Sequence, residues 1–387
     1  MAKLELIATA TFGLEAVVKR EVENLGYKIL KSEDGKITYL GDERAIAKSN
    51  IWLRCADRVL LKIGEFQAIS FEELFQGIKA LPWAEWIPRD GKFTVTGTSV
   101  KSTLHSVPDC QAIVKKAMVE KLKETYHCEW FEETGALYTI KVAILKDKVT
   151  ITIDTSGVGL HKRGYRVNDV IAPIKETLGS AMVQLSFWKE GRLLVDPFCG
   201  SGTLAIEAAM IGKNIAPGLY RKFAAEGWGT PSESIWKQER KSALDAIKHH
   251  GDLRIQASDI DPRAVKAAME NAAEAGVDDC IEFSVMSVNK LRATEEYGLI
   301  IGNPPYGERI GEKQEIEKIY KDLKNFYKTN PTWSFYIITM DKELEKLAFG
   351  RPADRRRKLY NGRLEVCYYQ YHGLRPAKVV DKSTCKE

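Results

Sequence analysis

The chain has 387 residues, more than one ordinary hydrophobic core accommodates, so two or three domains are expected. Its net charge of +5 is a small difference between 58 basic and 53 acidic residues, which favours nucleic acid over other partners only weakly. Charges are spread along the first residues and no apolar run is long enough to cross a bilayer, which argues against a signal peptide and a membrane association and predicts a cytoplasmic protein.

Two small α+β modules are predicted in the N-terminal part of the chain. In the first, residues 14–25 place apolar side chains on one helical face, residues 28–40 form two strands around the Asp34-Gly35 turn, and residues 57–66 are β-rich. The second is predicted to contain a helix, a strand, a long basic helix and a hairpin, over residues 71–81, 92–100, 109–127 and 136–155.

A segment rich in glycine and basic residues follows, and we interpret it as the connection between domains. Its sequence is TSGVGLHKRGYRVNDVIA, residues 155–172. Pro173 is then predicted to open a helix that has Ile174, Leu178, Ala181 and Leu185 on one side.

The segment RLLVDPFCGSGTLAIEAAM reads as the first βα unit of a doubly wound fold. An apolar strand ends at Asp196, and Gly200 and Gly202 allow the sharp turn and the close approach of a nucleotide-like ligand before a helix begins near Thr203. The pattern is neither GxGxxG nor a P-loop, and a carboxylate at the strand end suits a cation. S-adenosylmethionine carries an ammonium and a sulfonium but no phosphate, so the turn, with Pro197 and Phe198, favours this cofactor.

The second strand, in RIQASDIDPRAVKAAMENAAEAGV, ends in carboxylates. Asp259 is assigned to the ribose hydroxyls, with Asp261 as the second candidate, and Ile260 to the adenine face. Asp261 is also compatible with a helix N-cap before Pro262. A long insertion, residues 211–250, separates this acid from the glycine turn and is expected to form helices near the substrate mouth. After the third strand, Ser287 falls where an aspartate often meets the adenine amino group, so that cofactor contact stays open.

The most specific signal is LIIGNPPYGERIG, a buried strand that breaks at Asn303 and is followed by two prolines. Methylation of an exocyclic amine requires its lone pair to point at the methyl group, and acceptors must hold the two amine hydrogens. Asn303 Oδ1 and the carbonyl of Pro304 are predicted acceptors, Pro305 stiffens the loop, and Tyr306 can stack on the extruded base. An ordinary Asn-Pro turn is the alternative explanation.

The C-terminal segment RRRKLYNGRLEVCYYQYHGL predicts a hairpin around Asn361-Gly362. An antiparallel hairpin at the end of an otherwise parallel sheet is typical of this methyltransferase architecture. The seven cysteines form no CxxC pair and the six histidines show no ligand spacing, so reduced thiols and no metal site are expected.

Together these motifs resemble the RNA guanine-N2 methyltransferases that join a ferredoxin-like module and a THUMP domain to a Rossmann-fold methyltransferase. The resemblance spans the chain and rests on DPFCGSGT, DIDP, NPPYGER, LHKRGYR with APIKE, and KLYNGRLE. It implies an α/β fold with a mostly parallel seven-stranded class I methyltransferase sheet that ends in an antiparallel hairpin. The implied domains are a ferredoxin-like module, a THUMP domain, a basic linker and the methyltransferase domain, residues 1–65, 66–156, 157–172 and 173–387.

The resemblance also implies the substrate and further cofactor contacts. It implies transfer to guanine N2, most closely in large-subunit (23S) ribosomal RNA, and RNA binding by the N-terminal half. It places Pro173 and Glu176 near the methionine end of the cofactor, although Glu176 is equally a first-turn helix acid. The candidate RNA-binding residues are basic or aromatic side chains of the linker and of the basic helix: Lys162, Arg163, Tyr165, Arg166, Lys115 and Lys116. Periodicity alone makes the lysine helix a solvated face, so this alternative stays open.

Three other functions remain open at this level. The acceptor could be a guanosine of transfer RNA, or an adenine N6, because the NPPY motif grips an amine without naming the base. A protein of another class, an RNA-binding ribosome assembly factor, would retain the pocket without turnover. The sequence does not predict the oligomeric state.

Overall fold

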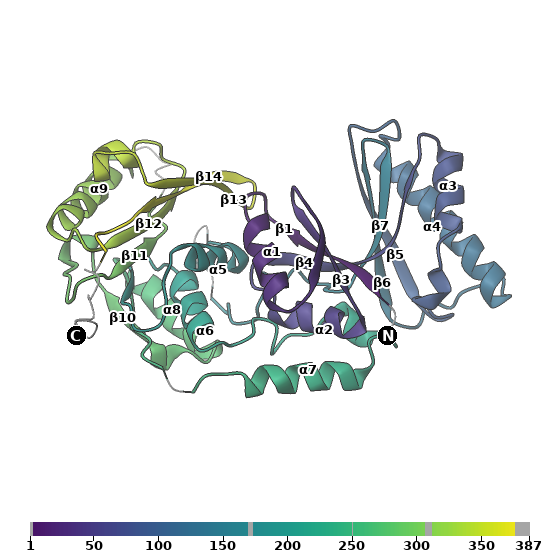
Figure 1. Ribbon diagram of the computed structural model, residues 1–387, viewed down its shortest axis with the longest axis horizontal. Helices are drawn as coiled ribbons and strands as arrows, with labels where there is room; N and C mark the ends of the chain where they lie inside the picture. Colours follow the sequence, from purple (N-terminus) through teal and green to yellow (C-terminus); the bar gives the residue numbers. More distant parts are fainter. Residues whose placement is uncertain (1–2, 169–172, 250, 306–311, 376–387) are drawn as a thin grey trace, which may run out of the picture. The chain divides into compact units, whose positions relative to one another are not determined.

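The computed structural model describes residues 3–168, 173–249, 251–305 and 312–375. The chain divides into two compact units, residues 1–163 with 216–246 and residues 164–215 with 247–387 (Figure 1). The predicted boundary at residue 173 therefore differs from the boundary between the units. Most of the insertion predicted over residues 211–250 belongs to the first unit, not to the catalytic one.

The first unit is built on one continuous seven-stranded sheet in the order β2-β3-β1-β4-β7-β6-β5. Its strands are β1 Leu4–Ala10, β2 Lys28–Glu33, β3 Lys36–Gly41, β4 Ala56–Gln67, β5 Lys92–Val100, β6 Leu137–Leu145 and β7 Lys148–Asp154. The long strand β4 pairs with β1 on one side and with β7 on the other, so the two predicted modules share a sheet. The pair β5–β6 is parallel, and the other pairs are antiparallel.

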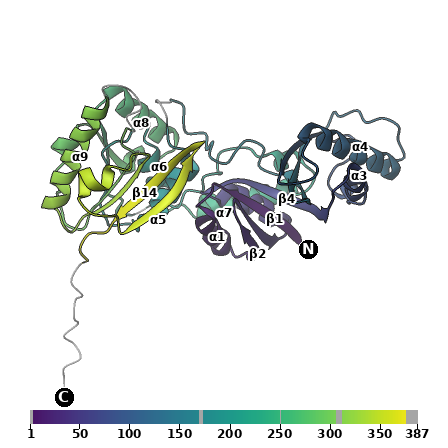
Figure 2. The ribbon, with the colours of Figure 1, turned by 90° about the horizontal axis from the view of Figure 1, so that it is seen from above.

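Five α-helices pack in this unit, within the residues that the structure describes. They are α1 Glu15–Asn24, α2 Glu43–Trp52, α3 Phe71–Lys79, α4 Val107–Tyr126 and α7 Glu233–Asp245. Asp42 caps α2 and Ser70 caps α3, each by accepting a hydrogen bond from a backbone N–H of the first turn. Helices α3 and α4 lie side by side (Figure 2), and α4 packs on β5. Helix α7 comes from the insertion and packs on α2, where Arg44 pairs with Glu239.

The second unit contains the predicted mostly parallel seven-stranded sheet, in the order β10-β9-β8-β11-β12-β14-β13. Its strands are β8 Leu194–Asp196, β9 Ile255–Asp259, β10 Ile281–Val285, β11 Leu299–Gly302, β12 Ser334–Thr339, β13 Arg355–Asn361 and β14 Leu364–Tyr371. Strand β14 lies antiparallel between β12 and β13, which confirms the predicted hairpin. From β8 the chain continues to β9 on one side and later to β11 on the other. In open α/β sheets, such a switch point is where ligands bind, at the carboxyl ends of the strands.

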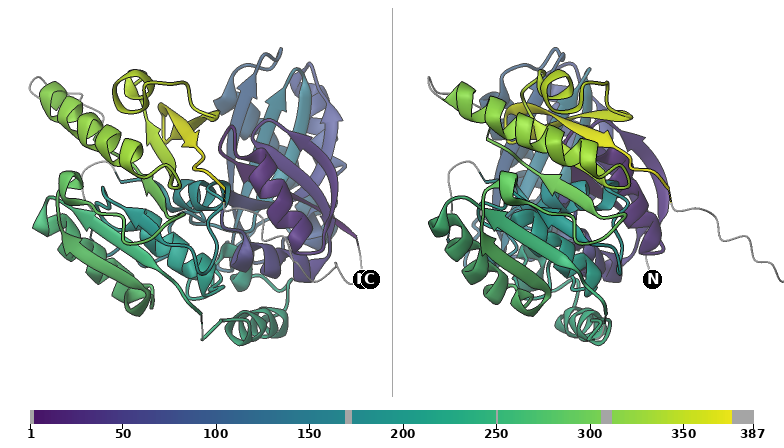
Figure 3. Two further views of the ribbon diagram at one scale, coloured as in Figure 1. Left: turned by 60° about the vertical axis from the view of Figure 1, so that its left-hand side comes forward. Right: turned by 90° about the vertical axis from the view of Figure 1, so that its left-hand side faces the viewer.

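Helices flank this sheet on both faces (Figure 3). They are α5 Glu176–Leu185, α6 Thr203–Gly212, α8 Pro262–Glu274 and α9 Glu312–Thr329. Helix α9 covers an aromatic core cluster that includes Tyr320, Phe326, Trp333 and Phe335. No helix in the described ranges is long and apolar enough to cross a membrane.

Helix α5 begins at Glu176, so the prediction that Pro173 opens it is wrong by one turn. The backbone of Lys175 is extended, with φ −63° and ψ 140°. This conformation is held from outside the helix: the carbonyl of Ile174 accepts a hydrogen bond from Arg166 Nη2 at 2.9 Å, and Lys175 N donates to Asn361 Oδ1 at 3.4 Å. These tertiary bonds compete with the helical conformation that the proline favours.

Candidate active site

Three strand ends meet at the switch point of the second unit. Strand β8 ends at Asp196, β9 at Asp259 and β11 at Gly302, directly before Asn303. Parallel pairing of β8 with both neighbours brings these ends to one edge of the sheet. The sequence-predicted carboxylates and amide therefore lie at the same edge.

The turn after β8 has a conformation that requires its glycines. Gly200 and Gly202 have φ +51° and +84°, in the left-handed region. A side chain at Gly202 would also place its Cβ 3.0 Å from that of Ala268. Cys199 N donates to the carbonyl of Ser258 at 2.9 Å, and the buried thiol of Cys199 packs in the turn.

Asp259 supports this turn from the neighbouring strand. Its Oδ2 accepts a hydrogen bond from Gly200 N, and its Oδ1 accepts one from Asp261 N, both at 3.0 Å. A carboxylate has about four acceptor positions, so capacity remains for a ligand's hydroxyls. Asp261 instead accepts from Arg263 N and caps α8, which confirms its N-cap interpretation. Between them, the Ile260 side chain is 73% exposed and accessible to a planar ligand.

Asp196 is the most strongly perturbed carboxylate of the site. Its Oδ1 accepts from Phe198 N at 3.1 Å, whereas its buried Oδ2 has no hydrogen-bond partner in the described ranges. Burial, with a smaller contribution from Asp259, raises the pKa of Asp196 to about 8. A buried carboxylate oxygen without a donor is costly unless a ligand supplies one, so this position fits a cationic ligand.

Asn303 also presents an unsatisfied acceptor. Its Oδ1 is buried and has no hydrogen-bond partner among the described residues. The strand end before it packs on the turn, since a Cβ at Gly302 would lie 3.0 Å from the ring of Phe198 and 3.8 Å from Asp196 Oδ1. Pro304 is buried and Pro305 is exposed, whereas Tyr306 lies outside the described residues.

Three models of known domain families match most of the chain. Residues 163–370 match the RMKL-like methyltransferase domain, residues 5–60 the RlmL ferredoxin-like domain and residues 68–154 the THUMP domain. The chain belongs to the RMKL-like methyltransferase family. This finding confirms the resemblance and the fold class inferred from the sequence.

Similar proteins cover nearly the full length. A Bacillus subtilis protein, YpsC, named as a candidate RNA methyltransferase, is 51% identical over 373 residues, which are 96% of each chain. The structure of a predicted N6-adenine-specific DNA methylase from Listeria monocytogenes has a TM-score of 0.92 and 48% identity, with 97% of each chain covered. SMU.472, a methyltransferase candidate complexed with SAH, has a TM-score of 0.92 and 42% identity, over 97% of this chain and all of the other.

Arg166 organises the side of this methyltransferase site that the linker provides. Its guanidinium pairs with Glu176 Oε1 at 2.9 Å and donates to Thr203 Oγ1 at 3.0 Å and Ser201 Oγ at 3.4 Å. It therefore ties the linker to both the glycine turn and the start of α5. This corrects the prediction that Arg166 contacts RNA phosphates, because its donors are directed to its own chain.

Glu176 is held by this ion pair in a buried environment. Burial raises the pKa of the Glu176 carboxyl, and Arg166 opposes this effect. Pro173, whose carbonyl accepts from Asn361 Nδ2 at 3.5 Å, lies on the same segment. The contacts of Pro173 and Glu176 with the cofactor remain predictions.

Two other linker residues predicted to bind RNA are buried. Arg163 is 6% exposed and donates to the carbonyls of Leu160, at 2.6 Å, and Arg54. Tyr165 is 5% exposed, and its hydroxyl donates to Glu207 Oε1 at 3.1 Å. Stacking of Tyr165 on a base and a phosphate contact of Arg163 are therefore not compatible with this structure.

The predicted RNA-binding lysines are at the surface. Lys162, Lys115 and Lys116 are all exposed. The ammonium groups of Lys115 and Lys116 lie 5.7 Å from the ring centroids of Phe93 and Phe75, respectively, so their aliphatic stems cover apolar surface. Phosphate binding by these lysines stays a prediction.

Ser287 follows β10 and is partly buried. The adjacent Met286 N donates to the carbonyl of Asp259 at 2.9 Å, so the segment lies beside the end of β9. A hydroxyl can accept one hydrogen bond from an adenine amino group without adding charge. The proposed contact is therefore compatible with this position and remains untested.

Two polar residues that support the site were missed from the sequence. Asn271, buried on α8, accepts from the backbone N–H groups of Val167 and Asn168, at 3.0 and 3.1 Å, and donates to the carbonyl of Ser201 at 3.0 Å. Glu207, buried on α6, accepts from Ser180 Oγ at 2.6 Å. The available signal was a polar side chain among apolar neighbours, in MENAA and AIEAA.

Substitution of Arg166 is expected to affect folding and cofactor binding together. Arg166→Ala leaves the buried Glu176 carboxylate without its charged partner, which typically costs about 3–5 kcal/mol. We expect a lower melting temperature and weaker S-adenosylmethionine binding, measured by thermal denaturation and calorimetry. The RNA affinity of the folded fraction should be unchanged. A loss of RNA affinity without a change in melting temperature or cofactor affinity would instead support phosphate binding by Arg166.

Cofactor binding is expected to depend on pH through Asp196. Because the pKa of Asp196 is about 8, the empty site retains a proton that a cationic ligand must displace. Calorimetric affinity for S-adenosylmethionine should rise by up to about tenfold per pH unit between about pH 6 and 7.5, the limit for one linked proton, and level off as pH passes 8. Asp196→Asn should bind more weakly with a flat profile. An equally steep profile in this variant would assign the proton to another group.

Proposed function

We propose that this chain transfers a methyl group from S-adenosylmethionine to the exocyclic N2 of a guanosine in RNA, with 23S ribosomal RNA as the preferred substrate. The buried Oδ1 of Asn303, directly after β11, has no hydrogen-bond partner among the described residues, and this observation carries the proposal. Asn303 follows the strand end that packs on the glycine turn. An acceptor at this position would lie beside the proposed cofactor site and could hold the amine of a substrate base.

The cofactor is S-adenosylmethionine, and the strand ends suit its parts. Asp259 retains acceptor capacity for the ribose hydroxyls, Ile260 offers an apolar face to the adenine, and Asp196 Oδ2 suits a positive charge. When bound, the cofactor supplies an electrophilic methyl group on a positively charged sulfur.

The residues of this chain have to orient the acceptor nitrogen. The N2 amine is a weak nucleophile, because its lone pair is delocalised into the guanine ring. Asn303 Oδ1 and the Pro304 carbonyl would each accept one amine hydrogen and so direct the lone pair along the axis of the breaking C–S bond. The new N–C bond takes the lone pair, the C–S electrons remain on sulfur, and one amine proton passes to an acceptor or to water. No strongly basic side chain is required for this step.

The choice of RNA rests on the domains beside the catalytic unit. The ferredoxin-like and THUMP domains share one sheet, and α4 presents lysines on its surface. The resemblance to RNA guanine-N2 methyltransferases supports guanine as the base and ribosomal RNA as the substrate.

Adenine N6 is the second candidate acceptor. The Listeria relative is named as an N6-adenine-specific DNA methylase, and the same Asn303 acceptor would hold an adenine amine equally well. The test is a competition among ribosomal RNA, transfer RNA and DNA, all without the host modifications, with methyl-labelled cofactor. The proposal predicts label in ribosomal RNA that ribonuclease releases. Label in transfer RNA would identify transfer RNA as the substrate in place of ribosomal RNA. Label in DNA alone would contradict the proposal that the chain methylates RNA.

A non-catalytic role as an assembly factor is the remaining alternative from the sequence. A factor of this kind would bind RNA without turnover. Labelled ribosomal RNA in the same competition experiment would exclude it.

A further inference from the structure

A surface on the first unit, outside the catalytic unit, is formed by two loops that a half-buried arginine joins. Arg221 of the insertion donates to the carbonyls of Val158, Gly159 and Lys162 in the linker, at 2.5, 2.8 and 2.9 Å. Burial, followed by the nearby charges of Arg163 and Arg58, lowers the pKa of Arg221 to about 10. Because these donors are engaged by backbone, Arg221 acts as a structural clamp between the loops.

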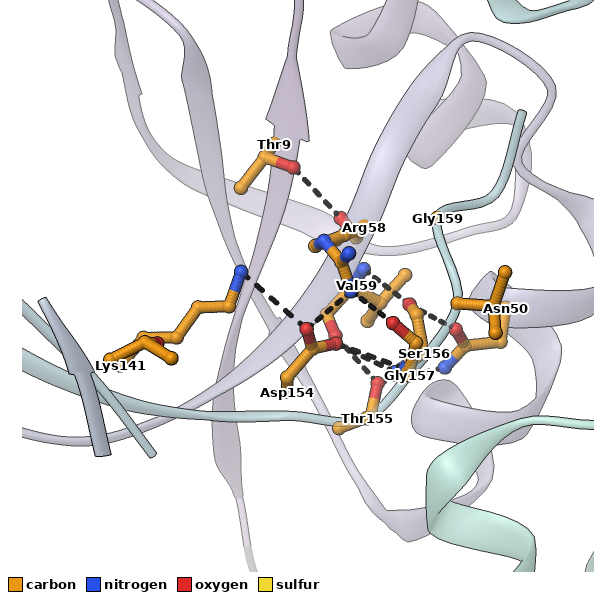
Figure 4. Close-up of polar contacts among 12 residues, drawn as sticks. Thr9, Asn50, Arg58, Val59, Lys141, Asp154, Thr155, Ser156, Gly157 and Gly159 are labelled. Atoms are coloured by element: carbon orange, nitrogen blue, oxygen red, sulfur yellow. Dashed lines mark hydrogen bonds and ion pairs between the residues drawn. The ribbon is translucent and has the colours of Figure 1, made fainter. Parts of the chain in front are cut away.

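The linker loop is fixed at its start by a polar network around Asp154 (Figure 4). Asp154 Oδ2 accepts from Arg58 Nη1 at 2.5 Å and lies 3.5 Å from Lys141 Nζ, while Oδ1 accepts from the N–H of Ser156 at 3.1 Å. Ser156 Oγ in turn donates to Asn50 Oδ1 at 2.6 Å. The network joins β4, β7, α2 and the loop, so the loop has little freedom to move.

The insertion loop is fixed as well. Gly218 N donates to the carbonyl of Ile51 at 2.9 Å, and a Cβ at Gly218 would lie 2.6 Å from the carbonyl oxygen of Asn50. Arg240 of α7 donates to the carbonyls of Leu219 and Arg221. The backbone on both sides of residue 220 is therefore held against the unit.

The residues exposed on these fixed loops include one aromatic and two cationic side chains. The Tyr220 side chain is 77% exposed, although the backbone carbonyls of its neighbours Leu219 and Arg221 both accept hydrogen bonds from Arg240. Lys222, the residue after Arg221, and Lys162, whose carbonyl accepts from Arg221, are also exposed. The acid of this segment, Glu226, is paired with Arg240. An exposed aromatic ring on a backbone that is held at both sides, together with two exposed lysines on the joined loops, combines a stacking face with phosphate-binding groups.

We propose that Tyr220, Lys222 and Lys162 form a binding surface for an unpaired strand of the substrate RNA. Tyr220 stacks on an unpaired base, and the two lysines contact flanking phosphates. Duplex RNA is a poorer ligand, because its bases are stacked internally and unavailable to the ring. The inference rests on the proposed function for the identity of the substrate. It also gives the insertion a role, since residues 216–246 add an aromatic side chain to the first unit.

The test is equilibrium binding of the full chain to a fluorescein-labelled unpaired oligoribonucleotide and to a labelled hairpin duplex. Tyr220→Ala should weaken binding of the unpaired strand by about tenfold, in the range found for loss of one base–aromatic stack, and Tyr220→Phe should bind as the unsubstituted chain does. Lys222→Ala should lower the slope of log affinity against log salt by about 0.7, the contribution of one phosphate on a single strand. Trp130→Ala is the matched control, since Trp130 is 79% exposed in the same unit beside Glu129.

Unchanged affinity in Tyr220→Ala and Lys222→Ala would overturn the inference, as would an equal loss with the duplex or with Trp130→Ala. Both substitutions are at exposed positions, and melting temperatures verify that the variants fold. The binding assay is independent of methyl transfer. If Tyr220→Ala loses RNA affinity while the unsubstituted chain forms no methylated guanosine, this inference holds and the proposed function is rejected. If Tyr220→Ala binds RNA normally while the unsubstituted chain forms methylated guanosine, the proposed function holds and this inference is rejected.

Discussion

Asn303→Ala is expected to lower the rate of methyl transfer by on the order of 10²–10³, the usual loss when one positioned polar group is removed from a reaction centre. The substitution deletes the buried Oδ1 that would hold an amine hydrogen, so the lone pair is no longer directed at the methyl group. Affinities for S-adenosylmethionine and RNA should remain within about twofold, because neither depends mainly on this oxygen. Single-turnover kinetics with labelled cofactor, together with separate binding measurements, check the prediction.

The matched control is Asn289→Ala, which deletes the same amide from an exposed position of the catalytic unit. This variant should retain full activity. Retention of normal turnover by Asn303→Ala would contradict the role of Asn303. A parallel loss of RNA affinity and turnover would instead make it a binding residue.

Asp259→Ala is expected to weaken S-adenosylmethionine binding by about a hundredfold or more. Two hydrogen bonds from ribose hydroxyls to a charged acceptor are worth about 1.5–3 kcal/mol each, and the carboxylate also holds the glycine turn through Gly200 N. Isothermal calorimetry measures the loss directly. RNA binding in the absence of cofactor should not change, because Asp259 lies in the catalytic unit.

Asp261→Ala separates the two acids of this strand end. Asp261 caps α8 through Arg263 N, so its loss should cost about 1 kcal/mol of stability and leave cofactor affinity nearly unchanged. A larger loss of cofactor affinity in Asp261→Ala than in Asp259→Ala would reverse the assignment of the ribose-binding acid.

Much of the fold could be predicted from local sequence patterns. The hairpin around Asp34-Gly35 and the strand Lys92–Val100 follow from turn residues and alternating side chains within a few positions. The terminal hairpin around Asn361-Gly362 follows in the same way. These elements are determined by neighbours in the sequence, which is why the patterns were sufficient.

The sequence could not reveal the tertiary partners of the linker. Composition made Arg163, Tyr165 and Arg166 candidates for RNA binding, but their partners Arg54, Glu207 and Glu176 come from other segments. A basic or aromatic residue in a glycine-rich stretch has the same sequence signature whether it faces solvent or a buried carboxylate. Burial decides between these roles, and it is set by packing at long sequence separation.

The same limit applies to the insertion. Helix α7 of the insertion packs on α2 within the first unit, a partner that the sequence did not indicate, and the expected place of the insertion near the substrate mouth stays a prediction. Phe223 and Trp236 stack on each other in that unit, with their ring centroids 5.5 Å apart. Their sequence pattern would suit the core of either domain, so it did not indicate which unit they belong to. In contrast, the strand-end positions of Asp196, Asp259 and Asn303 were predictable, because each motif includes both the buried strand and the polar residue that ends it.

The most direct test of the account is nucleoside mass spectrometry of ribosomal RNA that lacks the host modification, after reaction with the purified full chain and methyl-labelled S-adenosylmethionine. We expect labelled N2-methylguanosine with the unsubstituted chain and none with the Asn303→Ala variant. Labelled N6-methyladenosine, or no methylated nucleoside despite confirmed cofactor and RNA binding, would contradict it.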